Sequence, residues 1–412
     1  MNKGYLSEYF TGVWTKLLTR VDATTSSNQH EIGDTDSQGS LLRKVLGDSP
    51  RKQDNRFSAR YIWLNSEQES ISEDGLLSWY DSREKVHHRG PEWRLYYQTN
   101  SVTELMDEGD RLYVARQPDD TILFIVVPAG SSLANHVSYL FGLNIQSELG
   151  FGALEIKGDD DSALDFISRL VLDEMGIEFE DPNANSLDSI IERFGLVFPT
   201  TKAFSDRARL TLPAIDATDD PDAALMAWMD HEEAMFRRLE RRIVSERIAQ
   251  GFLSDGAVDV DGFLSFSLSV QNRRKSRAGL ALENHLQAVF EAYQIRFERH
   301  AITENKSKPD FLFPGGAEYH NATFASESLT MLASKSSCKD RWRQVLSEAA
   351  RIEQKHLLTL EPGISTSQTD EMKANKLQLV VPESLHRSFT SSQRAWLLNL
   401  GDFVQDVLNR QR

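Results

Sequence analysis

The N-terminal part of the chain is patterned as a series of short apolar runs. The runs are rich in β-branched and aromatic residues, are separated by polar turns, and lie at residues 59–64, 93–97, 111–115 and 121–127. Runs of this length and composition are typical of β-strands. Residues from Tyr5 to about Ile156 are therefore expected to form a β-rich domain, either a small barrel or a sandwich.

The strand-like pattern ends after about residue 156. Acidic, turn-rich sequence at residues 158–161 and 180–186 marks the region between two domains. From Asp220 to Ala249 the spacing is helical, with acidic residues early and arginines late, as the helix dipole favours. Helical and strand-like segments then alternate to the C-terminus. We expect a multidomain α+β chain with a β-rich domain over 1–175, a linker region over 176–200 and an α/β domain over 201–412.

Two strand-like segments of the C-terminal half carry a charged residue at one end. Asp310 begins a short apolar run within residues 308–314, which prolines bracket. Lys335 ends the apolar run 329–335 and shares a face with its alternate residues. A half-buried lysine is costly unless an anion compensates it, so Lys335 needs an acidic or phosphate partner. Taken alone, Asp310 also fits an ordinary turn aspartate.

Two predicted helices each place a glutamate beside an apolar face. Residues 339–353 have helical spacing, and Glu348 borders the buried face of that helix. Glu283 lies on a second predicted helix, 278–290. An ion pair at the edge of the core is the alternative interpretation of each glutamate, but the four charged groups together favour chemistry.

Carboxylates and a lysine that meet on adjacent strands suit metal-assisted hydrolysis of a phosphodiester. Carboxylate oxygens bind Mg²⁺, the metal neutralises the phosphate and lowers the pKa of a bound water, and a lysine positions or activates that water. A serine hydrolase is not indicated, because the chain has no Gly-x-Ser-x-Gly motif. Cys338 is better explained as a small packed side chain than as a nucleophile.

The overall charge argues at first against a nucleic-acid partner. The 412 residues include 46 Lys and Arg and 62 Asp and Glu, which gives a formal net charge of −16. Net charge averages over patches, however, and cations gather at residues 271–277 and 335–343. An acidic chain with two such clusters is compatible with a local DNA-binding surface.

Cysteine content and hydropathy indicate the cellular compartment in which the protein is expected. A single cysteine excludes a disulfide framework and a cysteine-based zinc site, since either needs several sulfurs. The first ten residues lack a basic and then apolar export signal, and the apolar run 122–128 is far shorter than the roughly 20 residues that cross a bilayer. We therefore expect a cytoplasmic protein with no membrane partner.

Three longer strings carry a resemblance to a known family. Residues 272–279, 308–314 and 338–344 are similar to the catalytic domain of the EcoRII restriction endonucleases, a group within the PD-(D/E)XK nuclease superfamily. The similarity extends from about Ser269 to the C-terminus and more weakly through the N-terminal half. It implies a homodimeric type II endonuclease that uses Mg²⁺ and cuts both strands of DNA at a CC-x-GG site, with CCWGG expected. The cut falls before the first C and leaves 5′-phosphate ends, and a cytosine methyltransferase is expected to protect the same site.

The resemblance also assigns catalytic roles. Asp310, Lys335 and Glu348 match the family's catalytic aspartate, lysine and helix-borne glutamate, with Asp310 and Glu348 as metal ligands, and Glu283 matches an additional acidic residue. The usual superfamily motif has an acid two positions before the lysine, whereas this chain has Ala333, so the second acid comes from Glu348, as in the EcoRII group. Tyr319 matches a tyrosine near the catalytic centre that is associated with autoinhibition. A packed loop tyrosine is the alternative.

DNA contacts are assigned to the two basic clusters. By resemblance, Lys339, Asp340 and Arg341 read the CC:GG half-site, where guanine offers acceptors and cytosine offers a donor. Phosphate contacts, which position the duplex without reading it, are assigned to four cations of the first cluster: Arg273, Arg274, Lys275 and Arg277. A solvated cluster at a helix start is the alternative.

The N-terminal domain resembles the effector-binding domain of the same family, a DNA-binding pseudobarrel. The matching segment is 79–95, and one DNA-reading arm would consist of Arg83, Arg89, Glu92 and Arg94, with His30 as a candidate for a second arm. Exposed turn and strand residues are the alternative. A binding domain joined to a nuclease implies a type IIE arrangement, in which one DNA copy acts as effector and relieves a block on the catalytic dimer.

Two other functions are compatible with the sequence. One is a catalytically silent DNA-binding protein on the same scaffold, although a binder has no need of Lys335 beside carboxylates. The other is an unrelated metal-dependent hydrolase of small phosphate esters, which would show no preference for any DNA duplex.

Arg341→Ala tests the predicted base contact. We expect weaker discrimination at one G position, by roughly 1–3 kcal/mol as for a bidentate contact to guanine. Binding titrations against duplexes that differ at each position of the site would measure it. A uniform loss of affinity across all sequences would reassign Arg341 to phosphate.

Overall fold

The computed structural model describes most of the chain, in two units. The described residues are 5–23, 30–33, 41–47, 55–65, 70–85, 88, 90–143, 151–156, 164–179, 193–212, 215–254, 256–338 and 342–412. Contacts divide the chain between Phe179 and Glu180, which lies within the region 176–200 expected to be a linker. Among the described residues, no helix is both long and apolar enough to cross a bilayer.

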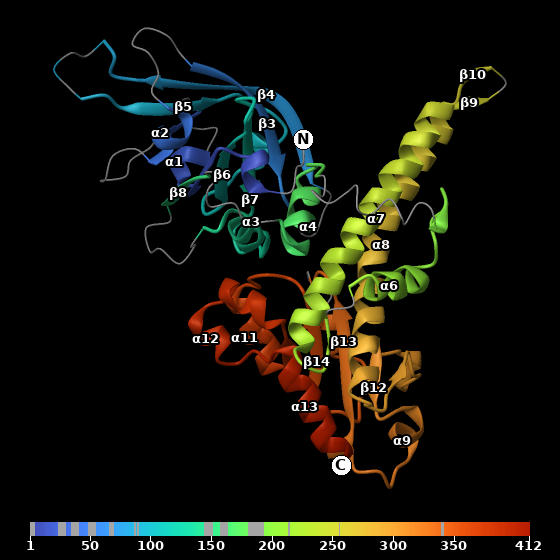
Figure 1. Cartoon of the computed structure of the whole chain (residues 1–412). Helices are drawn as coiled ribbons and strands as arrows, with labels where there is room; N and C mark the ends of the chain where they lie inside the picture. Colours follow the sequence, from blue (N-terminus) through green and yellow to red (C-terminus); the bar gives the residue numbers. More distant parts are fainter. Residues whose placement is uncertain are drawn as a thin grey trace. The chain divides into compact units, whose positions relative to one another are not determined.

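The first unit is built on one curled, eight-stranded sheet that forms a half-barrel (Figure 1). The strand order is β2-β5-β4-β3-β7-β6-β1-β8. The strands are β1 (Gly12–Leu17), β2 (Glu31–Gly33), β3 (Asn55–Trp63), β4 (Ile71–Asp81), β5 (Trp93–Tyr97), β6 (Arg111–Arg116), β7 (Ile122–Val127) and β8 (Phe151–Glu155). The helices are η1 (Leu6–Glu8), α1 (Arg20–Ala23), α2 (Leu41–Leu46), η2 (Thr103–Leu105), α3 (Leu133–Phe141) and α4 (Phe166–Glu174).

Both faces of the sheet are buried at β1, β6 and β7, whereas β4 is largely exposed. Successive residues of a strand alternate between two cores, because side chains point to opposite faces with a period of two: Tyr61 joins one core and Ile62 the other. The first core contains Trp14 and Trp79, and the second contains residues of α3 and α4. The predicted β-rich, barrel-like N-terminal domain is confirmed.

The second unit combines helices with a five-stranded mixed sheet of order β11-β12-β13-β14-β15. The strands are β11 (Glu298–Arg299), β12 (Phe311–Phe313), β13 (Thr330–Lys335), β14 (Lys355–Thr359) and β15 (Leu377–Val380). The first two pairings are antiparallel and the last two are parallel. β14 and β15 are almost wholly buried, as expected for parallel strands that are covered on both faces. The predicted α/β character of the C-terminal domain is confirmed.

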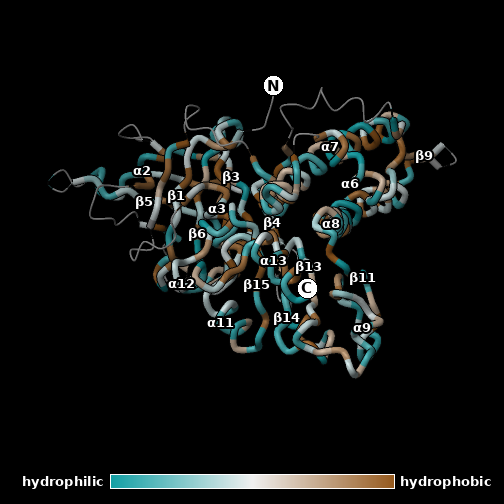
Figure 2. The backbone as a smooth tube through the Cα atoms, turned by 60° about the horizontal axis from the view of Figure 1, so that its bottom comes forward, coloured by the Kyte–Doolittle hydropathy of each residue, from teal (hydrophilic) through white to brown (hydrophobic). Residues whose placement is uncertain are grey.

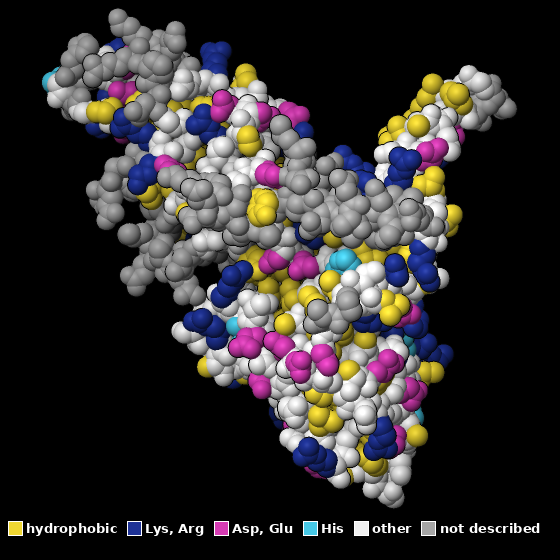
Figure 3. All heavy atoms as spheres, in the orientation of Figure 1, with side chains coloured by type: hydrophobic (Ala, Val, Ile, Leu, Met, Phe, Trp, Pro, Cys, Tyr) yellow, Lys and Arg dark blue, Asp and Glu magenta, His cyan; other side chains and the backbone are white. Residues whose placement is uncertain are grey.

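Two long helices form a hairpin in this unit. They are α7 (Pro221–Gln250) and α8 (Val260–Ala292), joined by the short strands β9 (Leu253–Ser254) and β10 (Ala257–Val258) (Figure 1). Hydrophilic and hydrophobic residues alternate along both helices (Figure 2), and the outer part of the hairpin exposes apolar side chains (Figure 3) such as Leu264 and Leu268. The remaining helices are α6 (Thr201–Leu210), η5 (Glu304–Lys306), α9 (Gly316–His320), η6 (Ser326–Ser328), α10 (Trp342–Val345), α11 (Thr366–Ala374), η8 (Glu383–Ser388), α12 (Ser391–Arg394) and α13 (Leu400–Gln411).

Aromatic packing holds α8 against the sheet. The ring of Phe290 lies 5.1 Å from that of Phe311 and 5.2 Å from that of Phe313, both on β12. Edge-to-face pairs of this kind add to the free energy gained by burying apolar area. The contact fixes one end of α8 close to the strand that Asp310 precedes.

A buried aspartate joins the start of α7 to the start of α13. The carboxylate of Asp222 accepts hydrogen bonds from the backbone N–H groups of Glu383 (3.1 Å), Leu400 (2.9 Å) and Gly401 (2.9 Å). These donors lie far along the chain from Asp222. The carboxylate therefore fastens the first turn of α13 to the helical hairpin.

Asp222→Ala is expected to lower the free energy of unfolding by about 2–3 kcal/mol, because it leaves buried N–H donors without an acceptor. The matched control is Asp219→Ala, an exposed residue near the same helix start, for which a change within about 0.5 kcal/mol is expected. Urea unfolding of the intact chain measures both. Equal effects of the two substitutions would contradict this role of Asp222.

Candidate active site

Asp310 and Lys335 meet where β12 and β13 pair. Phe311, the residue after Asp310, pairs with Leu332, so the Asp310 side chain reaches the last residues of β13. Its Oδ2 accepts the backbone N–H of Ser334 (2.7 Å), and the Nζ of Lys335 lies 3.4 Å from the same oxygen. The sequence prediction that Lys335 has an acidic partner is met by Asp310.

Glu348 is the second carboxylate at this place. Burial, and then the charge of Asp310, raises the pKa of Glu348 to about 7, against the opposite influence of Lys335 and Lys355. Its Oε2 is buried and has no hydrogen-bond partner among the described residues. Glu348 is therefore close enough to Asp310 and Lys335 to feel their charges, and its Oε2 still needs a positive partner.

The element that carries Glu348 is not the helix that the sequence predicts. The only helix within 342–353 is α10, which ends at Val345, and Glu348 lies in a bend after it. Tertiary contacts replace helical hydrogen bonds here: the N–H of Ala350 donates to Glu304 (3.0 Å), and the N–H of Arg351 donates to the Tyr319 hydroxyl (3.2 Å). The expectation of a helix-borne glutamate is wrong because these partners take the backbone donors.

Tyr319 lies beneath this bend. Its hydroxyl donates to the Glu304 carboxylate, whose two oxygens lie 2.8 and 2.6 Å away, and burial followed by Glu304 raises the pKa of Tyr319 to about 12. The guanidinium of Arg351 in turn donates to backbone carbonyls, including those of Tyr319 and Phe324. Tyr319 therefore supports the segment that presents Glu348.

Glu283 approaches the same edge of the sheet from α8. Its Oε2 lies 2.5 Å from Nη2 of Arg299 and 3.1 Å from Nε2 of His300. Arg299 is held in turn by Asn284 (3.2 Å) and Gln287 (2.8 Å), one turn of α8 or less from Glu283. The arginine thus fixes the direction of the Glu283 carboxylate.

His300 is a site residue that sequence reasoning missed. One ligand atom each from Glu283, His300 and Asp310 lie within 4.8 Å of one another. His300 is ten residues before Asp310, and no spacing motif links the two. Only the pairing of β11 with β12 brings them together.

The side chains present fit a divalent cation. Asp310, Glu348 and Glu283 supply carboxylate oxygens, the ligand type that Mg²⁺ prefers, and the Glu348 Oε2 lacks a partner among the described residues. Like charges held together at a partly buried place are relieved by such an ion. Asp310 and Glu348 remain the residues that would hold it.

Comparison with known proteins finds similarity over the part of the chain that contains these residues. A family model described as EcoRII C terminal matches residues 236–404, which include all of these residues. The type II restriction enzyme EcoRII of Escherichia coli is 46% identical over 189 residues. Residues 236–404 of the chain are therefore similar to the EcoRII C-terminal family. The aligned stretch covers 46% of this chain and 46% of that relative, so the chain spans about half the length of the curated protein it matches.

Two solved structures of restriction endonucleases also align with the chain. Metal-depleted Ecl18kI in complex with uncleaved, modified DNA has 18% identity and a TM-score of 0.41, over 54% of this chain and 83% of that chain. The PspGI–substrate DNA complex has 14% identity and a TM-score of 0.43, over 54% of this chain and 95% of that chain.

The first basic cluster lies on α8 within the EcoRII C-terminal family region, and its members differ in exposure. Arg273 is exposed, with its guanidinium 4.3 Å from the ring centre of Phe198, and Arg274 is half-buried and donates to Glu240 (2.7 Å). The side chain of Lys275 lies outside the described part of the chain. Among the cationic side chains of this cluster that the structure describes, only Arg273 is exposed as a phosphate contact requires.

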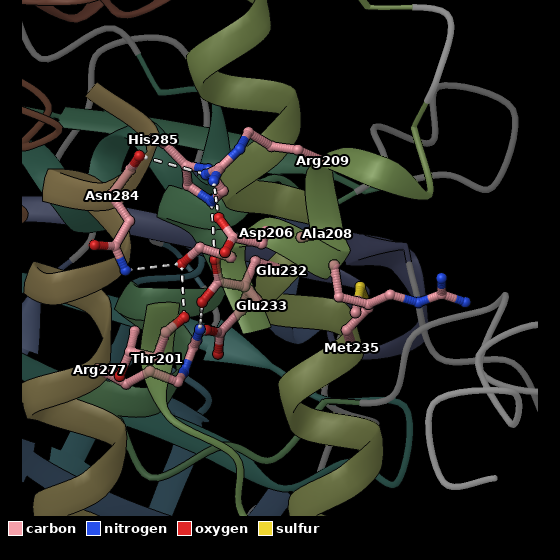
Figure 4. Close-up of polar contacts among 12 residues, drawn as sticks. Thr201, Asp206, Ala208, Arg209, Glu232, Glu233, Met235, Arg277, Asn284 and His285 are labelled. Atoms are coloured by element: carbon pink, nitrogen blue, oxygen red, sulfur yellow. Dashed lines mark hydrogen bonds and ion pairs between the residues drawn. The ribbon is translucent and has the colours of Figure 1, made fainter. Parts of the chain in front are cut away.

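The assignment of Arg277 to a phosphate contact is wrong, because this side chain lies in the interior. It is 6% exposed, and its guanidinium lies 3.0 Å from Glu232 and pairs with Glu233 (Figure 4). The guanidinium also lies 4.1 Å from the ring centre of Phe236. Burial lowers the pKa of Arg277, and Glu232 opposes that shift. Arg277 therefore joins α8 to α7 and does not face a DNA backbone.

This buried cluster extends to α6. His285 lies 2.9 Å from Glu232 and 2.9 Å from Arg209, and burial lowers the pKa of the imidazole (Figure 4). A charge taken out of water is tolerated only with a close partner. Each charged member of this cluster has one.

The base-reading residues of the sequence analysis, Lys339, Asp340 and Arg341, lie outside the described residues, as does Arg89. In the first unit, Glu92 is paired with Arg83 (2.6 Å) and Arg94 (2.5 Å) near the start of β5. His30 precedes β2 and its ring contacts that of Tyr97 edge-on at 5.5 Å. The predicted arm residues Arg83, Glu92 and Arg94 are thus neighbours in space.

Arg277→Ala tests the interior role. We expect a loss of about 3–5 kcal/mol in the free energy of unfolding, because Glu232 and Glu233 are left buried without a counter-charge. Arg273→Ala is the matched control on the same helix and is expected to cost only about 0.5–1 kcal/mol, the value of an exposed cation–π contact. Denaturant unfolding of both variants measures these changes in the free energy of unfolding. A neutral Arg277→Ala with weakened DNA binding would restore the phosphate assignment.

Proposed function

We propose that the chain is a type II restriction endonuclease that hydrolyses DNA phosphodiester bonds at a CC-x-GG site, with CCWGG expected, and depends on Mg²⁺. The observation that carries the proposal is the meeting of Asp310, Lys335 and Glu348 at one edge of the sheet. A protein that only binds DNA gains nothing from a lysine beside two partly buried carboxylates.

The side chains divide the chemistry between them. Asp310 is held by the Ser334 N–H and by Lys335, and Glu348 offers an oxygen without a partner among the described residues, so both can serve as metal ligands. When bound, Mg²⁺ neutralises the scissile phosphate and lowers the pKa of a coordinated water. The Lys335 ammonium, 3.4 Å from Asp310, positions the attacking water and donates to the phosphate oxygens.

Recognition is assigned to the segment between the two catalytic groups. Lys339, Asp340 and Arg341 lie between Lys335 and Glu348 along the chain, so base reading and cleavage would be coupled through one short segment. Duplex DNA with a palindromic site matches a homodimer, because each subunit then faces one half-site. A cytosine methyltransferase would protect the host DNA.

Regulation is assigned to the first unit. The paired Arg83, Glu92 and Arg94, with His30 and Arg89, would contact a second DNA copy as effector. The proposal rests on the curled sheet and on the sequence resemblance of residues 79–95, which lie outside the stretch that the family model matches. Tyr319 would take part in autoinhibition through the segment that carries Glu348.

Lys335→Ala and Asp310→Ala test the catalytic assignment. Both are expected to abolish cutting of a supercoiled plasmid with several CCWGG sites in Mg²⁺, with Lys335→Ala slower by about 10²–10⁴-fold, the usual contribution of a positioned proton-transfer group. Gel-shift titration without metal should show specific binding largely intact. The matched control is Lys376→Ala, an exposed lysine paired with Glu353, which should cut normally.

The outcomes separate the competing functions. Wild-type protein that binds the site without any cutting would indicate a silent DNA-binding protein. No preference for any duplex would indicate a hydrolase of small phosphate esters. Equal loss of binding and cutting in the variants would give Asp310 and Lys335 a structural role.

A further inference from the structure

A histidine completes a second group of ligands beside the candidate catalytic carboxylates. The ligand atoms of Glu283, His300 and Asp310 lie within 4.8 Å of one another, and the His300 Nε2 is 3.1 Å from the Glu283 Oε2. The His300 side chain is 47% exposed, so solvent ions can reach it. We propose that these three residues form a second divalent-cation position, distinct from the Asp310–Glu348 position, that takes Mn²⁺ or Co²⁺ in preference to Mg²⁺.

The backbone fixes this arrangement. Arg299 pairs with Phe311 in the β11–β12 ladder, and the N–H of His300 donates to the carbonyl of Asp310 (3.3 Å), which continues the ladder by one residue. His300 has φ of 53°, in the left-handed region that non-glycine residues rarely adopt. Such a conformation persists only where the surroundings hold it, and it is frequent at ligand sites.

Arg299 holds the Glu283 carboxylate in place, and the carboxylate still has lone-pair sites that can bind an ion. The guanidinium contacts Glu283 Oε2 at 2.5 Å and is itself anchored by Asn284 and Gln287. An ionised carboxylate has about four lone-pair sites on two oxygens, so one arginine and one histidine leave room for an ion. On the other side, Ser334 and Lys335 both contact the Oδ2 of Asp310.

The donor set decides which ion binds. Mg²⁺ is a hard ion that takes oxygen ligands and keeps its waters, whereas an imidazole nitrogen suits first-row transition ions. One nitrogen with two carboxylates therefore favours first-row transition ions, Mn²⁺ and Co²⁺ among them, over Mg²⁺. The inference deepens the proposed function, since the two positions would share Asp310.

The test uses the full chain with Mn²⁺ alone, without DNA. Pulsed electron paramagnetic resonance detects the ¹⁴N coupling of an imidazole bound directly to Mn²⁺, and it should be present in the wild type and absent in His300→Gln. Mn²⁺ affinity at this position should fall about tenfold or more in His300→Gln, the scale seen when metal-site residues are changed, with Mg²⁺ affinity unchanged. The matched control is His320→Gln, which alters a neighbouring exposed histidine and should keep the nitrogen signal.

A second variant guards against loss of folding. His300→Asp replaces the nitrogen by oxygen, so it should bind Mn²⁺ without the ¹⁴N signal and bind Mg²⁺ more tightly than the wild type does. Absence of the signal in the wild type, or its persistence in His300→Gln, would overturn the inference and leave a simple hydrogen bond between His300 and Glu283.

Failure of the inference can be told apart from failure of the proposed function. A nitrogen-bound Mn²⁺ in a protein that cuts no DNA would keep the cation position and overturn the endonuclease. Cutting by the wild type together with a spectrum that lacks ¹⁴N coupling would support the endonuclease function and overturn the second cation position.

Discussion

Two negative charges, those of Asp310 and Glu348, lie close together where water cannot fully separate them. Burial and mutual repulsion raise the pKa of Glu348 to about 7, so the pair is stable as two anions only beside positive charge. Lys335 supplies one such charge, 3.4 Å from Asp310. The sheet edge, the bend that presents Glu348 and the ladder that brings in His300 all serve to hold these groups together against that repulsion.

The site is supported from both sides by contacts that are not themselves catalytic. Arg351 and Tyr319 tie down the bend that contains Glu348. On α8, the Asn284 amide accepts from Arg299 through its oxygen and donates through its nitrogen to Ser205 on α6 (3.1 Å). The direction of Glu283 therefore depends on the packing of α6 against α8.

Sequence alone singled out Asp310 and Lys335, because each is a charged residue at one end of an apolar run, and the two-residue period of 329–335 puts Lys335 on the apolar face. The predicted helix does not continue after Val345. Local spacing favours a helix there, but tertiary partners accept hydrogen bonds from the backbone N–H groups. Sequence reasoning also assigned Arg277 to the surface, since a run of cations usually is solvated; the adjacent acids Glu232 and Glu233 on α7 were the signal that the run has an inward member. His300 depends on strand register, which no local pattern reveals.

The ion pairs between α7 and α8 determine how the hairpin can be assembled. Moving one helix along the other by a single turn would still bring apolar side chains together, because such side chains recur along both helices. It would also carry Arg277 away from Glu232 and Glu233 and strand three charges in the interior, a change far costlier than any repacking of methyl groups. The buried ion pairs thus determine the register of α7 against α8, because a hairpin with a shifted register is much less stable.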